Sequence, residues 1–181
     1  MEQTQSNTAY DDVCRTMLVE CDDLVISLIN ELFHEHLSRE DGIIRRANEH
    51  LISQQGGAQT KRITDGFIEI ISALEDIHKK YHIESESSME DSTMLVRIFE
   101  YAAQIAREDG KLEANVLTVE FPRSAIIYLR SRKSYVGPLS IRMITPGGEA
   151  AYEVPVMRIR DYTMEELLDR RLYFIIPFYL F

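Results

Sequence analysis

The sequence predicts an α/β protein in which helices and strands are mixed along the chain, and three observations indicate this class. Residues 10–37 place apolar side chains mostly at steps of three and four, which is the helical period. Residues 62–71 and 80–87 are rich in β-branched side chains or alternate apolar with polar ones, as strands do. Residues 89–107 return to the helical period. We therefore expect a helix, a β-hairpin and a second helix in succession.

The segment before the hairpin is expected to be mainly helical. Residues 1–8 are polar and predict a disordered lead-in. The acidic pair at 22–23 can divide the long helix into two. A shorter helix is expected over 42–51, and the glycine pair at 56–57 predicts a loop before the next strand.

Strands and one short helix are expected after residue 107. Pro155 limits the last of these strands to the edge of a sheet, because proline cannot donate a ladder hydrogen bond. Thr163 followed by Glu166 is typical of a capping box at the start of a helix. The strand-like runs cover 116–121, 125–130, 139–144 and 152–159.

Length and composition predict a single domain over residues 9–181. A chain of 181 residues with 45% hydrophobic content can build one sizeable core. Residues 173–181 stop inside an apolar run, which predicts either a chain truncated at its C-terminus or a last strand in the core. Residues 1–20 have no secretory signal, and the apolar run is far shorter than the ~20 residues that cross a bilayer. We expect a cytoplasmic protein that does not enter a membrane.

The net charge of −10 counts against a nucleic-acid partner, because DNA binding depends mainly on neutralising phosphates. A bound metal ion would offset part of this charge locally. Basic residues also occur in pairs, and Lys61 with Arg62 lies near the candidate site in sequence. Such pairs are more often simply part of a solvated surface.

Three acidic residues of the hairpin are candidates for a metal site. Glu84 and Glu86 are two apart on one strand, so their side chains share a face. In an antiparallel pair the two residue numbers add to a constant, here about 150. A sum of 149 or 151 sets Asp65 across from one of the two glutamates, whereas 150 places the acids on opposite faces.

A hard divalent cation would relieve the repulsion between carboxylates that converge in this way. Such an ion can generate a hydroxide-like nucleophile and stabilise the charge that develops on a phosphate. Phosphodiester hydrolysis with Mg²⁺ or Mn²⁺ is the chemistry that this implies. Acids that alternate on a strand also commonly mark a solvent-facing surface.

Several segments of the chain together carry a resemblance to a known family: 61–65 with 81–87, and 12–18, 48–50, 94–106, 119–125, 145–148 and 176–179. In these segments the chain resembles the PD-(D/E)XK nucleases, and more closely the bacterial recombination-promoting nuclease / putative transposase family. This resemblance implies a restriction-endonuclease-like central mixed sheet flanked by helices. It also implies a metal-dependent DNA endonuclease linked to recombination or transposition of mobile DNA.

Carried over residue by residue, the resemblance makes Asp65 and Glu84 the metal-binding acids. Glu86 stands where the superfamily has Lys and this family more often has Gln, and a glutamate there could act as a general base or ligate the metal. Glu49 matches the place of an additional acidic ligand in many members, although an ordinary helix surface explains it equally well.

Candidate DNA contacts come from one helix face and from the basic pair. Arg97, Tyr101 and Gln104 lie at steps of four and three, so they share a face that could touch the scissile phosphate or simply pack against its neighbours. Lys61 and Arg62 are the other candidates. The alternative is a catalytically degenerate nuclease fold that binds nucleic acid or protein. A third interpretation is an oligomerisation domain, and we consider a homodimer with the apolar chain end as its interface.

Overall fold

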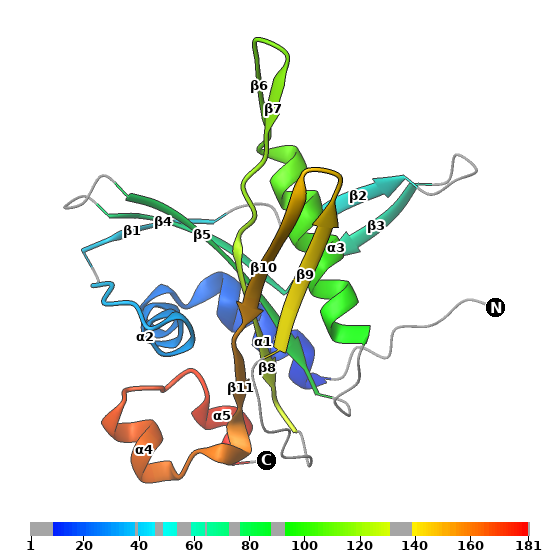
Figure 1. The fold of residues 1–181 in the computed structure, drawn as a ribbon. Helices are drawn as coiled ribbons and strands as arrows, with labels where there is room; N and C mark the ends of the chain where they lie inside the picture. The colour runs from blue at the N-terminus through cyan, green and yellow to red at the C-terminus, as the bar shows by residue number, and fades with distance from the viewer. Residues whose placement is uncertain are drawn as a thin grey trace.

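A five-stranded mixed sheet organises the fold (Figure 1). In sheet order its strands are β1 (Gly42–Arg45), β4 (Gly66–Ser72), β5 (Ile77–Glu86), β8 (Arg123–Tyr128) and β11 (Val156–Arg158). The first three are antiparallel, whereas β8 is parallel to β5 and β11 is parallel to β8. This arrangement confirms the predicted α/β class with a central mixed sheet. The computed structural model describes residues 9–38, 40–45, 49–53, 59–63, 65–72, 77–87, 93–130 and 139–180.

Helices cover both faces of the sheet. Helices α1 (Ala9–Glu20) and α2 (Asp22–Phe33) lie on one side and α3 (Thr93–Glu108) on the other (Figure 1). Consecutive residues of β8 belong to different apolar layers, with Ile127 packed in the first and Ile126 in the second. The break between α1 and α2 confirms the division expected at the acidic pair.

The helix predicted over residues 42–51 is wrong, because strands occupy its described residues, 42–45 and 49–51. Its first part is β1, and its second part belongs to β2 (Glu49–Ser53), which forms a separate ribbon with β3 (Gln59–Ile63). Ile43 pairs with Ile70 of β4 and packs against the core. A β-branched residue is well suited to that position, and pairing at the sheet edge overrides the weak helical period.

The strand predicted over residues 62–71 is in fact two strands. β3 ends at Ile63 and β4 begins at Gly66, with a bend at Asp65. A Cβ on Gly66 would lie only 3.1 Å from Cδ1 of the buried Leu18, so glycine allows α1 to approach the sheet closely here. The bend therefore places Asp65 immediately before the first residue of β4, directly beside α1.

The β4–β5 hairpin adopts one of the two registers that bring the acids together. Gly66 pairs with Ile83, and the residue numbers of every pair in this ladder add to 149. One step beyond the last pair, Asp65 is level with Glu84. The sequence was consistent with sums of 149, 150 and 151, and the structure shows a sum of 149.

Two more hairpins follow α3 in the described residues. They are β6 (Lys111–Glu113) with β7 (Val116–Thr118), and β9 (Leu139–Thr145) with β10 (Gly148–Val154). The strand expected over 116–121 ends early, at Thr118.

The strand expected over 152–159 is interrupted at Pro155. β11 is therefore a separate, three-residue strand at the edge of the sheet, as the proline predicted.

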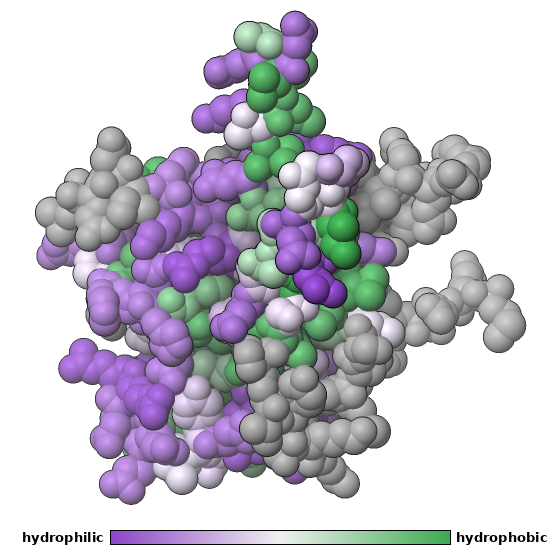
Figure 2. Space-filling view, viewed as in Figure 1, coloured by the Kyte–Doolittle hydropathy of each residue, from purple (hydrophilic) through white to green (hydrophobic). Residues whose placement is uncertain are grey.

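The β6–β7 hairpin projects from the body of the molecule (Figure 1). Its apolar side chains are exposed, with Leu112 at 73%, Val116 at 63% and Leu117 at 60%, and Figure 2 shows green side chains on the projection among purple, hydrophilic ones. The chain end, which the sequence analysis considered as an interface, also carries exposed apolar or aromatic side chains, at Tyr173, Tyr179 and Leu180.

The chain end packs into the core as a short helix, so the predicted last strand is wrong. Helix α5 (Ile176–Tyr179) carries a proline in its first turn, where the missing N–H has no helical partner to lose. Phe174, Ile175 and Phe178 are buried beside α1, α2 and the sheet.

The capping box predicted at Thr163 is confirmed. Its Oγ1 accepts a hydrogen bond from the backbone N–H of Glu166, whose carboxylate accepts one from the backbone N–H of Thr163. This box begins α4 (Met164–Asp169), which follows the 3₁₀ turn η1 (Ile159–Asp161). Among the described residues, no helix is long and apolar enough to span a membrane.

Candidate functional site

Asp65 and Glu84 meet where β4 begins and β5 nears its end. Both are buried, at 4% and 2% exposure. The backbone N–H of Asp65 donates a hydrogen bond to Oε1 of Glu84, with 3.2 Å between the heavy atoms. The hairpin register and the bend at Asp65 together place these two carboxylates side by side in the interior.

One oxygen of Asp65 is fixed by its neighbour on β5. The backbone N–H and the hydroxyl of Ser85 both donate to Oδ2, at 2.8 and 2.7 Å. Ser85 is itself buried and belongs to the strand that carries Glu84. Two donors from one residue hold the carboxylate in a single orientation.

The other oxygen of Asp65 faces an arginine from α1. Nε and Nη2 of Arg15 donate to Oδ1 at 3.1 and 2.9 Å. Burial, and then the negative charge of Glu84, raise the pKa of Asp65 to about 6, although the hydrogen bonds from Ser85 and the charge of Arg15 oppose this rise. Burial and the neighbouring carboxylate thus both disfavour the ionised form of Asp65.

Glu84 is oriented by a buried histidine. Nε2 of His82 lies 3.0 Å from Oε1 of Glu84, and Nδ1 lies 3.2 Å from the hydroxyl of Ser124 on β8. His82 is fully buried, and the ring of Tyr101 packs edge-on against it at 5.8 Å. The chain Ser124–His82–Glu84 fixes this carboxylate from the sheet side, as outer partners of metal-binding groups do.

Arg97 links the two glutamates from the other side. Its Nε lies 3.0 Å from Oε2 of Glu84, and its Nη1 lies 3.5 Å from Oε2 of Glu86. Its Nη2 donates to the backbone carbonyl of Ser85 at 3.1 Å. The predicted third acid, Glu86, therefore lies at the same site, and its side chain is 22% exposed where that of Glu84 is 2%.

The remaining predicted residues have other surroundings. Tyr101 is buried against His82, and Gln104 is buried with its Nε2 donating to Glu108 at 2.6 Å. Arg97 is thus the member of the predicted helix face that contacts the acids. The side chains of three other candidates lie outside the described part of the structure: Glu49 of β2, and Lys61 and Arg62 of β3. Glu49 lies on a strand, whereas the sequence predicted a helix there.

A divalent metal ion is the group that the hairpin acids imply. Among the described residues, no cluster of three or more His, Cys, Asp or Glu side chains could hold a metal. Mg²⁺ nevertheless keeps several waters and commonly binds proteins through only one or two carboxylates. Asp65 and Glu84 supply two such carboxylates, and burial together with the negative charge of Glu84 raises the pKa of Asp65, so an added positive charge would favour its ionised form. These residues therefore fit such an ion.

Arg15, His82, Ser85 and Ser124 complete the site, and the sequence did not identify them as site residues. The alternation on β5 could have identified His82, because it lies two residues before Glu84 and so shares its face. Arg15 and Ser124 come from α1 and β8, far away in the sequence, and only the tertiary fold brings them close.

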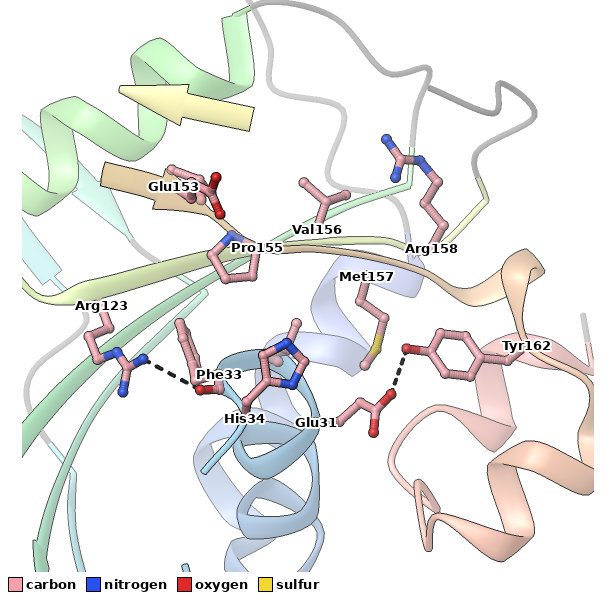
Figure 3. Close-up of a pocket in the computed structure, with 12 residues that line it drawn as sticks. Glu31, Phe33, His34, Arg123, Glu153, Pro155, Val156, Met157, Arg158 and Tyr162 are labelled. Atoms are coloured by element: carbon pink, nitrogen blue, oxygen red, sulfur yellow. Dashed lines mark hydrogen bonds between the residues drawn. The ribbon is translucent and has the colours of Figure 1, made fainter. Parts of the chain in front are cut away.

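A pocket of about 490 Å³ lies elsewhere, between the end of α2 and β11 (Figure 3). In it the hydroxyl of Tyr162 donates to Glu31 at 3.0 Å, and Arg123 donates to the carbonyl of Phe33 at 3.4 Å. None of the residues that line it belongs to the acidic site. Two of its charged groups are paired with residues outside the lining, Glu31 with Arg170 and Arg123 with Glu35, and the pocket indicates no particular ligand.

Comparison of the chain with protein-family models, with curated proteins and with solved structures gave no match.

Proposed function

We propose that the chain is a metal-dependent DNA endonuclease of the PD-(D/E)XK type that hydrolyses phosphodiester bonds, with Asp65 and Glu84 as ligands of Mg²⁺ or Mn²⁺. The observation that carries this proposal is the register of the β4–β5 hairpin, which buries the two carboxylates against each other. The succession of helices, three antiparallel strands, a helix and a parallel strand also supports the restriction-endonuclease-like arrangement that the resemblance implies. A role in recombination or transposition of mobile DNA follows from the same resemblance.

Each residue has a distinct role in this proposal. Ser85 and His82 hold the two carboxylates in place, so that little reorganisation is needed when a cation binds. The bound ion would activate a water molecule and stabilise charge on the phosphate. Glu86, the more exposed acid, accepts a proton from that water as a general base or adds a ligand. Arg97 is the candidate contact to the scissile phosphate.

A plasmid cleavage assay with Mg²⁺ or Mn²⁺ tests this proposal. Asp65→Asn and Glu84→Gln preserve side-chain shape but remove the charge, and each should lower the cleavage rate by more than the ~10–100-fold that loss of an outer partner costs. Asp169→Asn and Glu149→Gln, at exposed positions on α4 and β10, are the matched controls and should cleave like the wild type. Absence of cleavage by the wild type, or undiminished cleavage by both site variants, would contradict the catalytic proposal.

A DNA substrate in a bacterial cell implies a cytoplasmic location, and we propose this location together with a homodimer as the working assembly. Light scattering on the purified chain tests the assembly directly. A molar mass near 21.0 kDa at all concentrations would rule out the homodimer.

One observation favours a second candidate function, a nuclease fold without catalysis that binds nucleic acid or protein. Arg15 and Arg97 neutralise the acids in the metal-free protein, and Glu86 supplies no positive charge at the place where the superfamily has Lys. Calorimetric titration with Mn²⁺ separates the two candidates. A module of this second kind would show no Mn²⁺ binding that depends on Asp65.

A further inference from the structure

We infer that the guanidinium of Arg97 takes the place of the metal ion in the metal-free protein, where it supplies the positive charge beside the carboxylates of Glu84 and Glu86. It must move away from both carboxylates before the ion binds. This inference rests on the proposed function, because it concerns the regulation of the same site. It predicts that metal affinity is limited by an arginine of the chain itself.

The two oxygens of Glu84 have different kinds of partner. Oε1 is held by the framework, through the backbone N–H of Asp65 and the ring of His82. Oε2 faces Arg97 at 3.0 Å. Oε2 of Glu86 faces the same guanidinium at 3.5 Å. One positive group thus sits between the carboxylate oxygens that a cation could use.

Asp65 has the same division of partners. Ser85 fixes Oδ2 through its backbone and its hydroxyl, whereas Oδ1 receives two hydrogen bonds from Arg15. In both buried acids, therefore, one oxygen is bound by the sheet and the other by an arginine. An arrangement of this kind keeps the carboxylates oriented while an exchangeable cation compensates their charge.

A guanidinium and a divalent ion cannot share this position. Arginine keeps its proton in proteins, so it cannot reduce the repulsion by becoming neutral. Its long side chain can instead move, and that of Arg97 is 31% exposed at the site. Apart from the acids, the described residues hold the guanidinium through a hydrogen bond to the carbonyl of Ser85. Displacement of Arg97 is consequently the step that makes room for the ion.

Isothermal titration of the full chain with Mn²⁺ tests this inference. In Arg97→Gln the competing charge is absent, and we expect the Kd for Mn²⁺ to fall by roughly tenfold, because removing a cation beside two carboxylates strengthens their attraction for another. Arg107→Gln removes the same charge from an exposed position on the same helix and should bind like the wild type. A purely structural role for Arg97 predicts the opposite result, a loosened site with weaker binding.

The outcomes separate this inference from the proposed function. Tighter binding by Arg97→Gln supports the inference, even if the wild type binds no Mn²⁺ at all. If the wild type binds Mn²⁺ and Arg97→Gln binds equally or more weakly, the inference fails and the proposed metal site stands. If neither protein binds, both are wrong.

A measurement on the wild type covers the case in which Arg97→Gln does not fold. The Nε–Hε signal of Arg97 in a ¹⁵N-labelled sample should shift as Mg²⁺ is added, because its contact with Glu84 is lost. An unchanged Arg97 signal at saturating Mg²⁺ would overturn the inference.

Discussion

The raised pKa of Asp65 predicts that the metal-free protein loses stability as the pH rises, and that Asp65→Asn does not share this loss. The carboxyl has a pKa of about 6 in the folded protein and an ordinary value of 3.8. At low pH it is protonated in both states. As the pH rises through this range the unfolded chain releases the proton first, so the unfolded state gains stability relative to the folded state.

The magnitude follows from the distance between the two pKa values. At about 1.4 kcal/mol for each pKa unit, the change from 3.8 to about 6 corresponds to about 3 kcal/mol. This contribution is fully present below pH 3.8 and is lost once the pH has passed about 6. Most of it, on the order of 2–3 kcal/mol, should disappear between about pH 4 and about pH 7.5.

Urea unfolding in the presence of a chelator measures this effect. The free energy of unfolding of Asp65→Asn, relative to that of the wild type, should rise by roughly 2–3 kcal/mol over the same pH range, because the amide cannot ionise. Asp169→Asn, on the exposed side of α4, controls for the general effect of removing a carboxylate. If the curves of Asp65→Asn and the wild type run parallel with pH, the assignment of a costly buried charge to Asp65 is refuted.

Three further variants test the packing and the support of the site. Thr163→Ala removes the capping hydrogen bond to Glu166 and should cost about 1 kcal/mol in urea unfolding; an unchanged midpoint would show that the box adds nothing. Leu28→Ala, fully buried on α2, should cost about 2–5 kcal/mol, whereas Leu168→Ala, 49% exposed, should cost far less, and similar losses would contradict the described core. His82→Ala should weaken Mn²⁺ binding in calorimetry by roughly 10–100-fold, and wild-type affinity would exclude its orienting role.

The sequence predicted elements best where local signals were strong. The amphipathic period of α3, the acidic break before α2, and the capping box at Thr163 all depend on residues close together in the chain. The segment 42–51 was mistaken for a helix because its strand character comes from pairing with β4 and β3, which local composition does not contain.

The candidate site was also predicted only in part: its acidic residues could be deduced from the sequence, whereas their arrangement could not. The identity of Asp65, Glu84 and Glu86 as candidates could be deduced from their spacing and from the motif that they resemble. Whether Asp65 shares a face with the two glutamates depended on a shift of one residue in the hairpin register, and the sequence was consistent with sums of 149, 150 and 151. In the register that the structure adopts, Gly66 pairs with Ile83 and lies close to Leu18 of α1, directly after the bend at Asp65.

By itself, the sequence determined the α/β class, the order of the main elements and the acids that could act on a metal. These follow from residue type and from periods of two and 3.6, which operate over a few residues. Only the tertiary structure decided that Arg15 and Arg97 face those acids and that His82 and Ser85 hold them. The partners come from α1, α3 and two strands of the sheet, and contacts between elements so distant in the chain depend on packing.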